Sequence, residues 1–379
     1  MKKSPLWLAV GGLLAMAAGI GVGRFVYTPI LPPMVEALGL SKSAAGLIAS
    51  ANFVGYFAGA LLAALRLPGT RRTWLIGALL VNAAGLAAMA LVSSLAAFLA
   101  LRLVAGIASA FALIFASALV LDRLAAAGRG KLSAVHFAGV GTGIAVSAAL
   151  VATLHDWRTM WLASAALALF ASVAVATLVP PDRPGAAAPA SAPRTPFPPG
   201  FVPLAIAYGL FGFGYIITAT FIVALVRGSP DIAHLEPVIW VLFGVSAAPS
   251  VALWNGLGAR WGIRRAFYAA ALVEAAGVAL SALWVTSATV IAAAVLVGGT
   301  FMGLTALGLI AAREGGGDPR PRLALMTASF SAGQIVGPVL AGWLYDKTGT
   351  LVVPSYAAAA ALVVAGYLTI SPRLSRVAG

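Results

Sequence analysis

The chain has 379 residues, of which 61% are hydrophobic and only 9% are charged, and its mean hydropathy is +1.01. This composition excludes a soluble globular protein, in which about a quarter of the residues carry charge. The absence of cysteine also excludes a disulfide framework and metal sites built from thiolates.

Apolar runs of about twenty residues recur along the chain, and each can cross a hydrocarbon core of about 30 Å as a helix. The start of the chain, Lys2 and Lys3 before an apolar run, is similar to a secretory signal peptide. Because this run continues to Val35 and more spans follow, we expect it to be retained as the first helix. We predict twelve transmembrane helices, near residues 7–35, 43–65, 73–93, 95–121, 132–154, 157–178, 201–226, 237–258, 266–286, 288–312, 323–345 and 351–370.

The formal net charge of +14 reflects topology and does not indicate nucleic-acid binding. If the N-terminus is cytoplasmic, eighteen of the 24 Lys and Arg residues fall on the cytoplasmic side and two, Arg24 and Arg102, fall within spans. The four outer residues are Lys42, Arg158, Arg227 and Lys347. By the positive-inside rule, both termini are predicted to be cytoplasmic.

A stretch rich in proline and alanine, residues 180–200, predicts an extended cytoplasmic linker. It divides the chain into residues 1–179 and 201–379, each with six predicted helices. Short motifs recur at corresponding places in the two halves, which favours an internal duplication. They are Gly21–Arg24 with Gly212–Tyr215, Gly69–Arg72 with Gly262–Arg265, and the small residues Gly139, Gly143 and Ser147 with Gly333, Gly337 and Ala341.

The first predicted helix contains features that a simple membrane anchor does not need. Glycines alternate from Gly19 to Gly23, so a neighbouring backbone can come close. Arg24 brings a permanent charge, which costs about 2.5–3.5 kcal/mol near a bilayer centre. Pro29, Pro32 and Pro33 each remove a helix hydrogen bond, so we expect a kink or unwinding there. These features predict a helix that lines a polar cavity.

The loop after the eighth predicted helix reads Gly-Leu-Gly-Ala-Arg-Trp-Gly-Ile-Arg-Arg over residues 256–265. It resembles the signature of the major facilitator superfamily of transporters, a Gly, an Asp and then Arg-x-Gly-x-Arg-Arg, except that Ala259 replaces the Asp. Residues 65–72 resemble a more eroded copy that also lacks the acid. In the family that Asp helps to latch the outward-facing state. The motif residues carried over are Gly69, Arg71, Arg72, Gly256, Arg260, Gly262, Arg264 and Arg265.

Three further motifs resemble the same family. Residues 102–106 are similar to its Arg-x-x-x-Gly element in the fourth span. Residues 333–338 are similar to a Gly-x-x-x-Gly-Pro element, which is better known from the fifth span of antiporters, where residues 139–144 lack the proline. The Gly-Arg-Phe-x-Tyr-Thr-Pro run that begins at Gly23 resembles a bacterial subgroup.

The resemblance, which covers the whole chain, implies two six-helix bundles that rock around a central site. It implies a secondary active transporter in the bacterial inner membrane, which we expect to be a monomer. A multidrug or sugar transporter of the same fold is an alternative, and a membrane-embedded enzyme or non-transporting scaffold is a rival from another class. Because no hydrolase, zinc-protease or nucleotide-binding motif is present, and the three histidines form no metal motif, we expect no enzyme activity and no cofactor.

The charged residues within the spans are the strongest site candidates. Arg24 either anchors an anionic substrate group or extends to the outer membrane surface. Arg102 either links helices through backbone carbonyls or gates on protonation. Glu274 is either a proton carrier or a neutral, hydrogen-bonded carboxyl group, and the latter is favoured because the family's ninth helix is peripheral. His136, in the first turns of the fifth predicted span, is a titratable group and is better placed than Glu274 for proton coupling; its alternative is an interfacial histidine.

A set of polar residues falls at positions that correspond to the cavity-lining helices of the family: Tyr27, Asn52, Tyr56, Tyr208, Tyr215 and Gln334. Any one of them can also serve as packing between helices. Because Arg24 and Arg102 outnumber the central acid Glu274, we expect a positive cavity that selects a small organic anion, a carboxylate, moved together with protons.

Overall fold

The computed structural model describes residues 4–65, 67–181, 197–314 and 320–370. Within these ranges every regular element is a helix, and twelve of the spans are long and apolar enough to cross a membrane. The predicted number of spans is confirmed, and their limits agree with the prediction to within several residues. Residues 182–196, which make up most of the predicted linker at 180–200, lie outside the described residues, as do Arg66, residues 315–319 and the terminal residues 1–3 and 371–379.

The first six spans precede residue 180. They are α1 (Pro5–Met16) with the π-helix η1 (Ala17–Val22) and α2 (Tyr27–Leu38); α3 (Lys42–Ala63); α4 (Arg71–Met89); α5 (Leu95–Ala126); η2 (Gly130–Leu132) with α6 (Ser133–Val151); and α7 (Trp157–Leu178). We refer to these spans as the N half.

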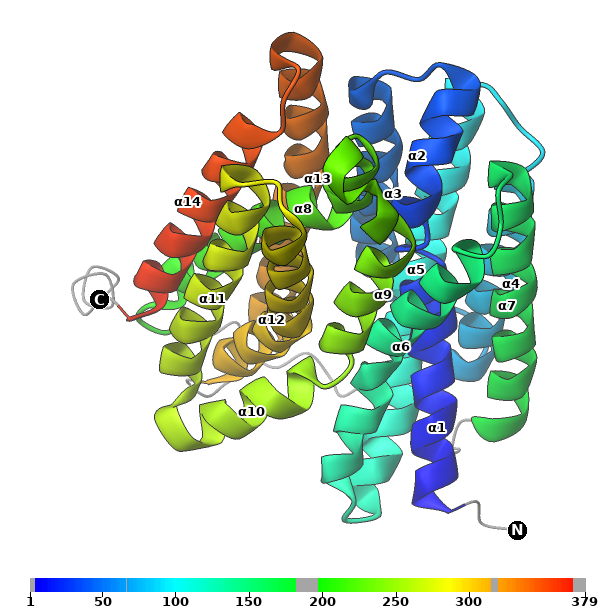
Figure 1. Cartoon of the computed structure of the whole chain (residues 1–379). Coiled ribbons are helices and arrows are strands. Elements are labelled where there is room, and N and C mark those ends of the chain that lie inside the picture. Colours follow the sequence, from blue (N-terminus) through cyan, green and yellow to red (C-terminus); the bar gives the residue numbers. More distant parts are fainter. Residues whose placement is uncertain (1–3, 66, 182–196, 315–319, 371–379) are drawn as a thin grey trace.

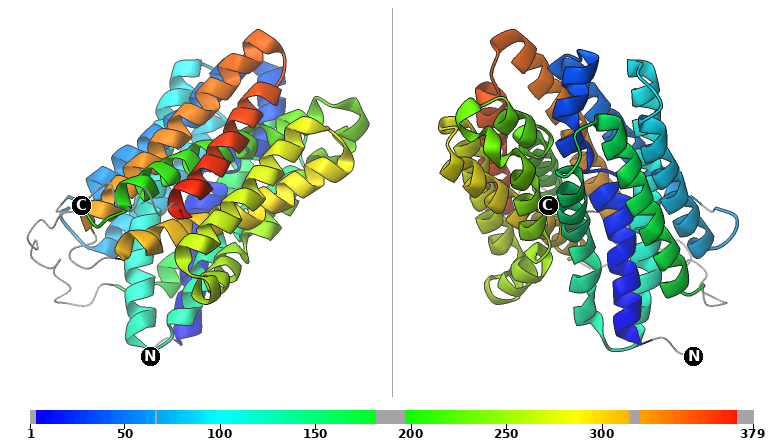
Figure 2. Two further views of the ribbon diagram at one scale, coloured as in Figure 1. Left: turned by 90° about the vertical axis from the view of Figure 1, so that its left-hand side faces the viewer. Right: turned by 45° about the vertical axis from the view of Figure 1, so that its right-hand side comes forward.

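The other six spans follow residue 200 and form the C half. They are α8 (Phe201–Arg227); η3 (Pro230–Leu235) with α9 (Glu236–Ala247) and α10 (Ser250–Trp261); α11 (Ile263–Leu283); α12 (Ser287–Arg313); α13 (Arg320–Thr348); and α14 (Val352–Ile370). The two halves form two groups of helices that lie side by side (Figure 1). The right-hand view of Figure 2 shows the same division, with most spans running along one common direction.

Polar residues in front of the apolar runs set where several helices begin. Each accepts a hydrogen bond from the backbone N–H three residues later, which satisfies a donor that the first helical turn leaves free. The capping residues of this kind are Ser41, Thr70, Ser94, Asp156 and Thr286.

The small residues that recur in the two halves make equivalent contacts. Gly139 of α6 lies against the backbone of α1 at Leu13, and Gly333 of α13 lies against the backbone of α8 at Gly209. A Cβ atom on either glycine would collide with that backbone. The fifth span therefore packs on the first span in the same way that the eleventh packs on the seventh. Small residues allow this close approach of two helices.

The two loop motifs also adopt matching turns. Gly69 and Gly262 have φ angles of 89° and 88°, a conformation that glycine adopts without strain. In the first copy, Arg71 lies 3.4 Å from the carboxylate of Asp122, and Arg72 donates to the carbonyls at the end of α7. These partners belong to the same half. The arginines of the first copy thus bind within the N half in this conformation.

The halves contact each other on the side that is predicted to be periplasmic. The carboxylate of Asp346 in α13 accepts hydrogen bonds from the N–H groups of Lys42 (3.1 Å) and Ser43 (2.9 Å) at the start of α3. Deeper in the same contact, the Ser50 hydroxyl donates to the Ile335 carbonyl at 2.8 Å. The first turn of α3 is therefore held by an acid from the other half.

A salt bridge reinforces this contact at the ends of α2 and α8. Arg227 donates to both carboxylate oxygens of Glu36, at 2.7 and 2.5 Å, and to Glu236 at 3.0 Å. Glu36 lies in the N half, whereas Arg227 and Glu236 lie in the C half. We call these contacts, together with those of Asp346, the outer gate.

Candidate functional site

The first span is irregular at the place where Arg24 lies. The π-helix η1 is followed by a turn at residues 23–26, and only then does α2 begin. We predicted the distortion at Pro29, Pro32 and Pro33, and this position is wrong because all three prolines lie within α2. The break falls in the glycine-rich segment instead, where the backbone has the most freedom.

Donors from other helices satisfy the carbonyls of this irregular segment. The Asn82 amide of α4 donates to the Gly19 carbonyl at 3.0 Å. The indole N–H of Trp240, in the C half, donates to the Phe25 carbonyl at 3.2 Å. That carbonyl is the one whose usual helical donor is missing at Pro29. Non-helical backbone at this depth is stable only with such partners.

Arg102 supplies the most extensive support. Its guanidinium donates to the carbonyls of Gly23 (3.3 Å) and Arg24 (3.1 Å), and it lies 5.0 Å from the ring centre of Tyr27. The carbonyl of Arg102 in turn accepts a hydrogen bond from the Asn52 amide at 3.1 Å. Of the two interpretations of Arg102, the structural link through backbone carbonyls is the one that these contacts describe.

Arg24 projects into the contact between the halves. Its guanidinium donates to the side-chain oxygen of Gln334 at 2.7 Å and lies 4.5 Å from the ring centres of both Phe53 and Tyr56. Only 5% of the residue is exposed. The alternative that Arg24 extends to the membrane surface is therefore wrong for this conformation.

A chain of three polar side chains connects the halves through Arg24. The Gln334 amide nitrogen donates to the Tyr215 hydroxyl, so the chain runs Arg24–Gln334–Tyr215 from the broken first span to α13 and α8. We call it the central polar chain. The salt bridges among the described residues do not include Arg24. Among the described residues, an amide dipole and ring faces are the groups that balance its charge.

Aromatic rings from both halves surround this chain. The ring centres of Tyr215 and Phe301 are 5.5 Å apart, and those of Tyr215 and Phe330 are 6.0 Å apart, in nearly parallel planes. Phe25 of the N half contacts Phe301 edge-on at 5.9 Å. We call the set of rings the aromatic shell: Phe25, Phe53, Tyr56, Tyr215, Phe301 and Phe330.

The four phenylalanines of the aromatic shell were not among the predicted site residues. A signal existed for three of them, because Phe25 adjoins Arg24, Phe53 lies three residues before Tyr56, and Phe330 lies four residues before Gln334. Phe301 carries no such signal, since α12 is apolar all round.

Two other predicted site tyrosines bind backbone carbonyls next to the site. The Tyr27 hydroxyl donates to the Ala45 carbonyl at 2.9 Å, and the Tyr208 hydroxyl donates to the Thr305 carbonyl at 3.1 Å. The ring of Tyr208 lies 5.0 Å from that of Phe330, so Tyr208 borders the aromatic shell. Their contacts are those expected of packing between helices.

His136 and Glu274 lie apart from Arg24, one in each half. His136 is fully buried, its Nε2 lies 3.1 Å from the Ser117 hydroxyl, and its ring packs against Gly12 of α1. Glu274 is also fully buried, with its carboxyl group beside the Thr300 hydroxyl. A hydrogen bond with Thr300 is the one that the expected neutral carboxyl group would make.

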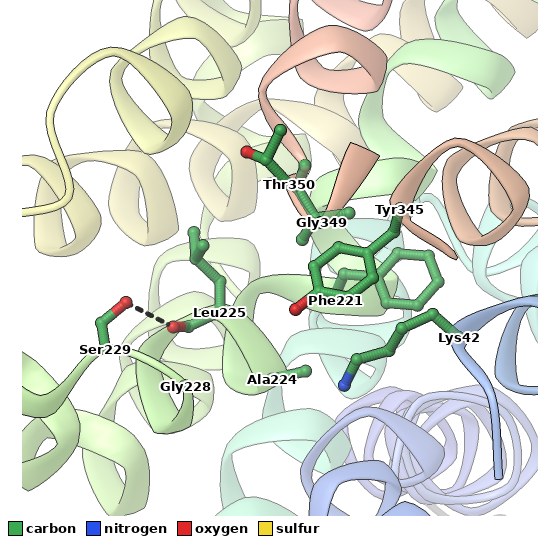
Figure 3. Close-up of a pocket in the computed structure, with 10 residues that line it drawn as sticks. Lys42, Phe221, Ala224, Leu225, Gly228, Ser229, Tyr345, Gly349 and Thr350 are labelled. Carbon is green, nitrogen blue, oxygen red and sulfur yellow. Dashed lines mark hydrogen bonds between the residues drawn. The ribbon is translucent and has the colours of Figure 1, made fainter. Parts of the chain in front are cut away.

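Two clefts open on the predicted periplasmic side. The first has a volume of about 190 Å³ and lies between Lys42 of the N half and Phe221, Ser229 and Tyr345 of the C half (Figure 3). The second, about 400 Å³, extends between the halves from His155 to Arg227. Neither cleft is lined by a residue of the central polar chain. Arg227 and Glu236 of the outer gate line the second cleft, and Lys42 lines the first.

The chain is similar to known transporters in sequence and in fold. Over 188 residues it is 32% identical to a chloramphenicol resistance protein of Streptomyces lividans. The matched region covers 48% of this chain and 47% of that protein. Over 165 residues it is 33% identical to a putative uncharacterized transporter, YgaY, of Escherichia coli K12, with 42% of each chain covered. These matches span less than half the length of each relative.

Solved structures of the nucleoside transporter NupG share the fold. One of them, of a NupG mutant, superposes with a TM-score of 0.73 over 96% of this chain and 99% of that chain, at 16% identity. The other NupG structure gives a TM-score of 0.70 over 97% and 98%, at 17% identity. The model of the family described as "Uncharacterised MFS-type transporter YbfB" matches residues 16–370. The chain therefore belongs to this family of transporters of the major facilitator superfamily.

Proposed function

We propose that this transporter moves a small organic anion across the bacterial inner membrane by secondary active transport. The observation that carries the proposal is Arg24, a buried guanidinium in the contact between the halves, whose hydrogen-bond partner is the neutral amide of Gln334. A permanent charge buried without an opposite charge is costly. An anionic solute that binds there supplies the missing charge.

The surroundings of Arg24 increase its preference for anions. Arg102 is 2% exposed, and its guanidinium lies on the carbonyl of Arg24 itself, so two positive charges occupy one desolvated region. Positive charge with low-dielectric walls attracts anions and repels cations. A carboxylate can also accept two parallel hydrogen bonds from a guanidinium, a geometry that a lysine ammonium cannot offer.

We propose that protons drive the transport and that Glu274 carries them. This residue is a fully buried carboxyl group of the C half that lies beside the Thr300 hydroxyl and within electrostatic reach of Tyr215 in the central polar chain. His136 is less suited, because its ring is enclosed among α1, α5 and α6, where Ser117 occupies one of its nitrogens.

The experiment for anion transport uses the purified protein in liposomes with an imposed pH gradient. We expect saturable uptake of at least one organic anion from a panel of carboxylates. Arg24→Ala should abolish this uptake, and Arg24→Lys should weaken it because the forked donor geometry is lost. Arg158→Ala, which removes an arginine outside the central contact, is the matched control. Wild-type flux in Arg24→Ala, or a protein that carries only neutral or cationic solutes, contradicts the proposal.

Proton coupling has a separate readout. Glu274→Gln keeps the shape of the side chain but cannot release a proton. It should therefore lose uptake driven by the pH gradient while retaining exchange of labelled for unlabelled solute. His136→Gln should retain both activities. If Glu274→Gln still responds to the pH gradient as the wild type does, Glu274 is not the proton carrier.

Efflux of an uncharged drug is a second candidate. The observation in its favour is the similarity of 48% of the chain to a chloramphenicol resistance protein. This function predicts that cells expressing the transporter survive higher drug concentrations and that Arg24→Ala retains the effect. Loss of resistance in Arg24→Ala would count against a neutral substrate.

A further inference from the structure

The side chains that surround Arg24 indicate the shape and polarity of the solute as well as its charge. Two ring faces lie against the guanidinium, with the ring centres of Phe53 and Tyr56 each 4.5 Å from it. On the other side of Gln334, Tyr215 is stacked against Phe301 and Phe330. Each of these rings is at least nine-tenths buried. The site therefore combines one cation with flat apolar surfaces.

The number of available cations limits the solute to one negative charge. Gln334 holds a single nitrogen of Arg24, and the buried Nε of Arg24 has no hydrogen-bond partner among the described residues, so this guanidinium has capacity to bind a carboxylate. The Nε of Arg102 is also without a partner among the described residues, but both terminal nitrogens of Arg102 are already bound to the carbonyls of Gly23 and Arg24, which the broken first span needs. A second carboxylate on the solute would find no free cation among these groups, and burying it unpaired is costly.

The aromatic shell crosses the contact that alternating access must open. Phe25 of the N half contacts Phe301 at 5.9 Å and Trp240 at 6.5 Å, both in the C half. When the halves separate, these ring faces come into contact with water, which is unfavourable for apolar surface. A solute with an aromatic body covers the exposed faces and stacks on them with the offset geometry that rings prefer.

The shell offers few hydrogen bonds to a polyhydroxylated solute. Beside Arg24, its polar groups are the hydroxyls of Tyr56 and Tyr215 and the amide of Gln334. Tyr215 and Gln334 are already bonded to each other. Sugar hydroxyls buried against the remaining ring faces would stay without partners, and each such group weakens binding.

We propose that the transported anion is an aromatic monocarboxylate. Its carboxylate takes the place of the Gln334 oxygen on Arg24, and its ring lies between the rings of Phe53 and Tyr56 on one side and the stack around Tyr215 on the other. Gln334 thus holds the position of the carboxylate while the site is empty. In this we rely on the anion transport proposed above, and we specify which anions the site takes.

The first test uses the full-length wild-type protein in liposomes and benzoate as the probe. Four competitors each change one property: cyclohexanecarboxylate removes the aromatic faces, benzamide removes the charge, terephthalate adds a second charge, and gluconate replaces the ring with hydroxyls. We expect saturable benzoate uptake that unlabelled benzoate inhibits at least about threefold more strongly than any of the four, the factor that one aromatic contact supplies. Equal inhibition by cyclohexanecarboxylate or stronger inhibition by gluconate overturns the proposal.

The second test removes single rings of the shell. Phe301→Leu and Phe330→Leu should each raise the KM for benzoate by about threefold to tenfold while raising that for cyclohexanecarboxylate less than about twofold. Phe98→Leu, which removes a buried ring that packs on Trp157 inside the N half, is the matched control and should change neither KM. Equal changes for the two acids mean that the rings do not recognise aromatic faces, and they refute the proposal.

A binding measurement covers the case in which the variants do not fold. Benzoate should raise the melting temperature of the detergent-solubilised wild type, and Arg24→Lys should reduce this shift, whereas benzamide should not stabilise the protein. Uptake of gluconate or succinate that depends on Arg24, with no benzoate binding or uptake, refutes the aromatic substrate and leaves anion transport in place. The absence of uptake for every anion refutes the proposed function itself.

Discussion

The outer gate offers the sharpest test of how the two halves move. Glu36→Gln replaces the carboxylate that receives two hydrogen bonds from Arg227, at 2.7 and 2.5 Å, with a neutral amide of the same shape. Arg227 keeps Glu236, its partner in the same half. The substitution therefore weakens a contact between the halves and leaves a contact within one half.

The size of the effect follows from the exposure of the pair. The side chains of Arg227 and Glu36 are 32% and 60% exposed, so solvent screens much of their attraction. Exposed ion pairs contribute up to about 1 kcal/mol, and the two-pronged geometry places this pair near the upper end of that range. A loss of about 1 kcal/mol shifts the equilibrium between the closed and open gate about fivefold toward the open form.

Cysteine labelling measures this shift, because the parent chain has no cysteine. Ala219 of α8 is 1% exposed, its carbonyl accepts a hydrogen bond from Thr28 at 2.7 Å, and it lies about 12 Å inside Arg227 along the helix. A membrane-impermeant maleimide added outside intact cells should label Ala219→Cys about fivefold faster when Glu36→Gln is also present. Raising the salt concentration to about 1 M should speed labelling of the parent, because the Debye length falls to about 3 Å.

Asp156→Asn is the matched control for this experiment. Asp156 is an acid on the same predicted side, but it caps α7 through Thr159 and so acts within the N half. It should leave the labelling rate unchanged. Rates within twofold of the parent for both Glu36→Gln and Arg227→Gln would refute the role of this salt bridge in holding the gate closed.

Three further predictions concern stability, closure and orientation. Arg102→Met should lower the melting temperature of the solubilised protein, because each buried carbonyl that loses its donor costs about 1–3 kcal/mol. An unchanged melting temperature together with a loss of proton coupling would instead favour the interpretation that Arg102 gates on protonation. Gly46→Val should abolish transport, because its Cβ meets the backbone of α13, whereas Gly77→Val, with open space around it, should transport normally. Ser229→Cys should react with impermeant maleimide outside intact cells and Ala187→Cys should not, and the reverse pattern would overturn the predicted topology.

Local sequence was sufficient to predict the membrane spans. A run of apolar residues long enough to cross the bilayer must be helical, because in lipid every backbone group has to find its partner within the segment. This requirement is local, so the twelve spans were predictable one at a time. The recurrence of the motifs at Gly69 and Gly262 was also visible in the sequence, and the structure adds that both glycines have a positive φ, which glycine adopts without strain.

The sequence predicted that the first span is distorted but not where the distortion lies. Arg24 and the glycines around it correctly indicated an unusual helix, but the prolines suggested the wrong place for the break. A proline removes one hydrogen bond, and its effect depends on whether another group takes the freed carbonyl. Trp240 takes that of Phe25, and this donor is more than two hundred residues away in the sequence, so local rules could not place the break.

The partners of Arg24 were decided by the tertiary structure alone. Its contact with Gln334 joins residues 310 positions apart, and the rings of Phe301 and Phe330 reach the site from two helices of the C half. Sequence by itself determined that the chain has twelve membrane spans and that the first of them carries a charged residue. Which side chains surround that charge depends on how helices from the two halves pack, and the apolar pattern of a membrane helix, the same on every face, does not encode that packing.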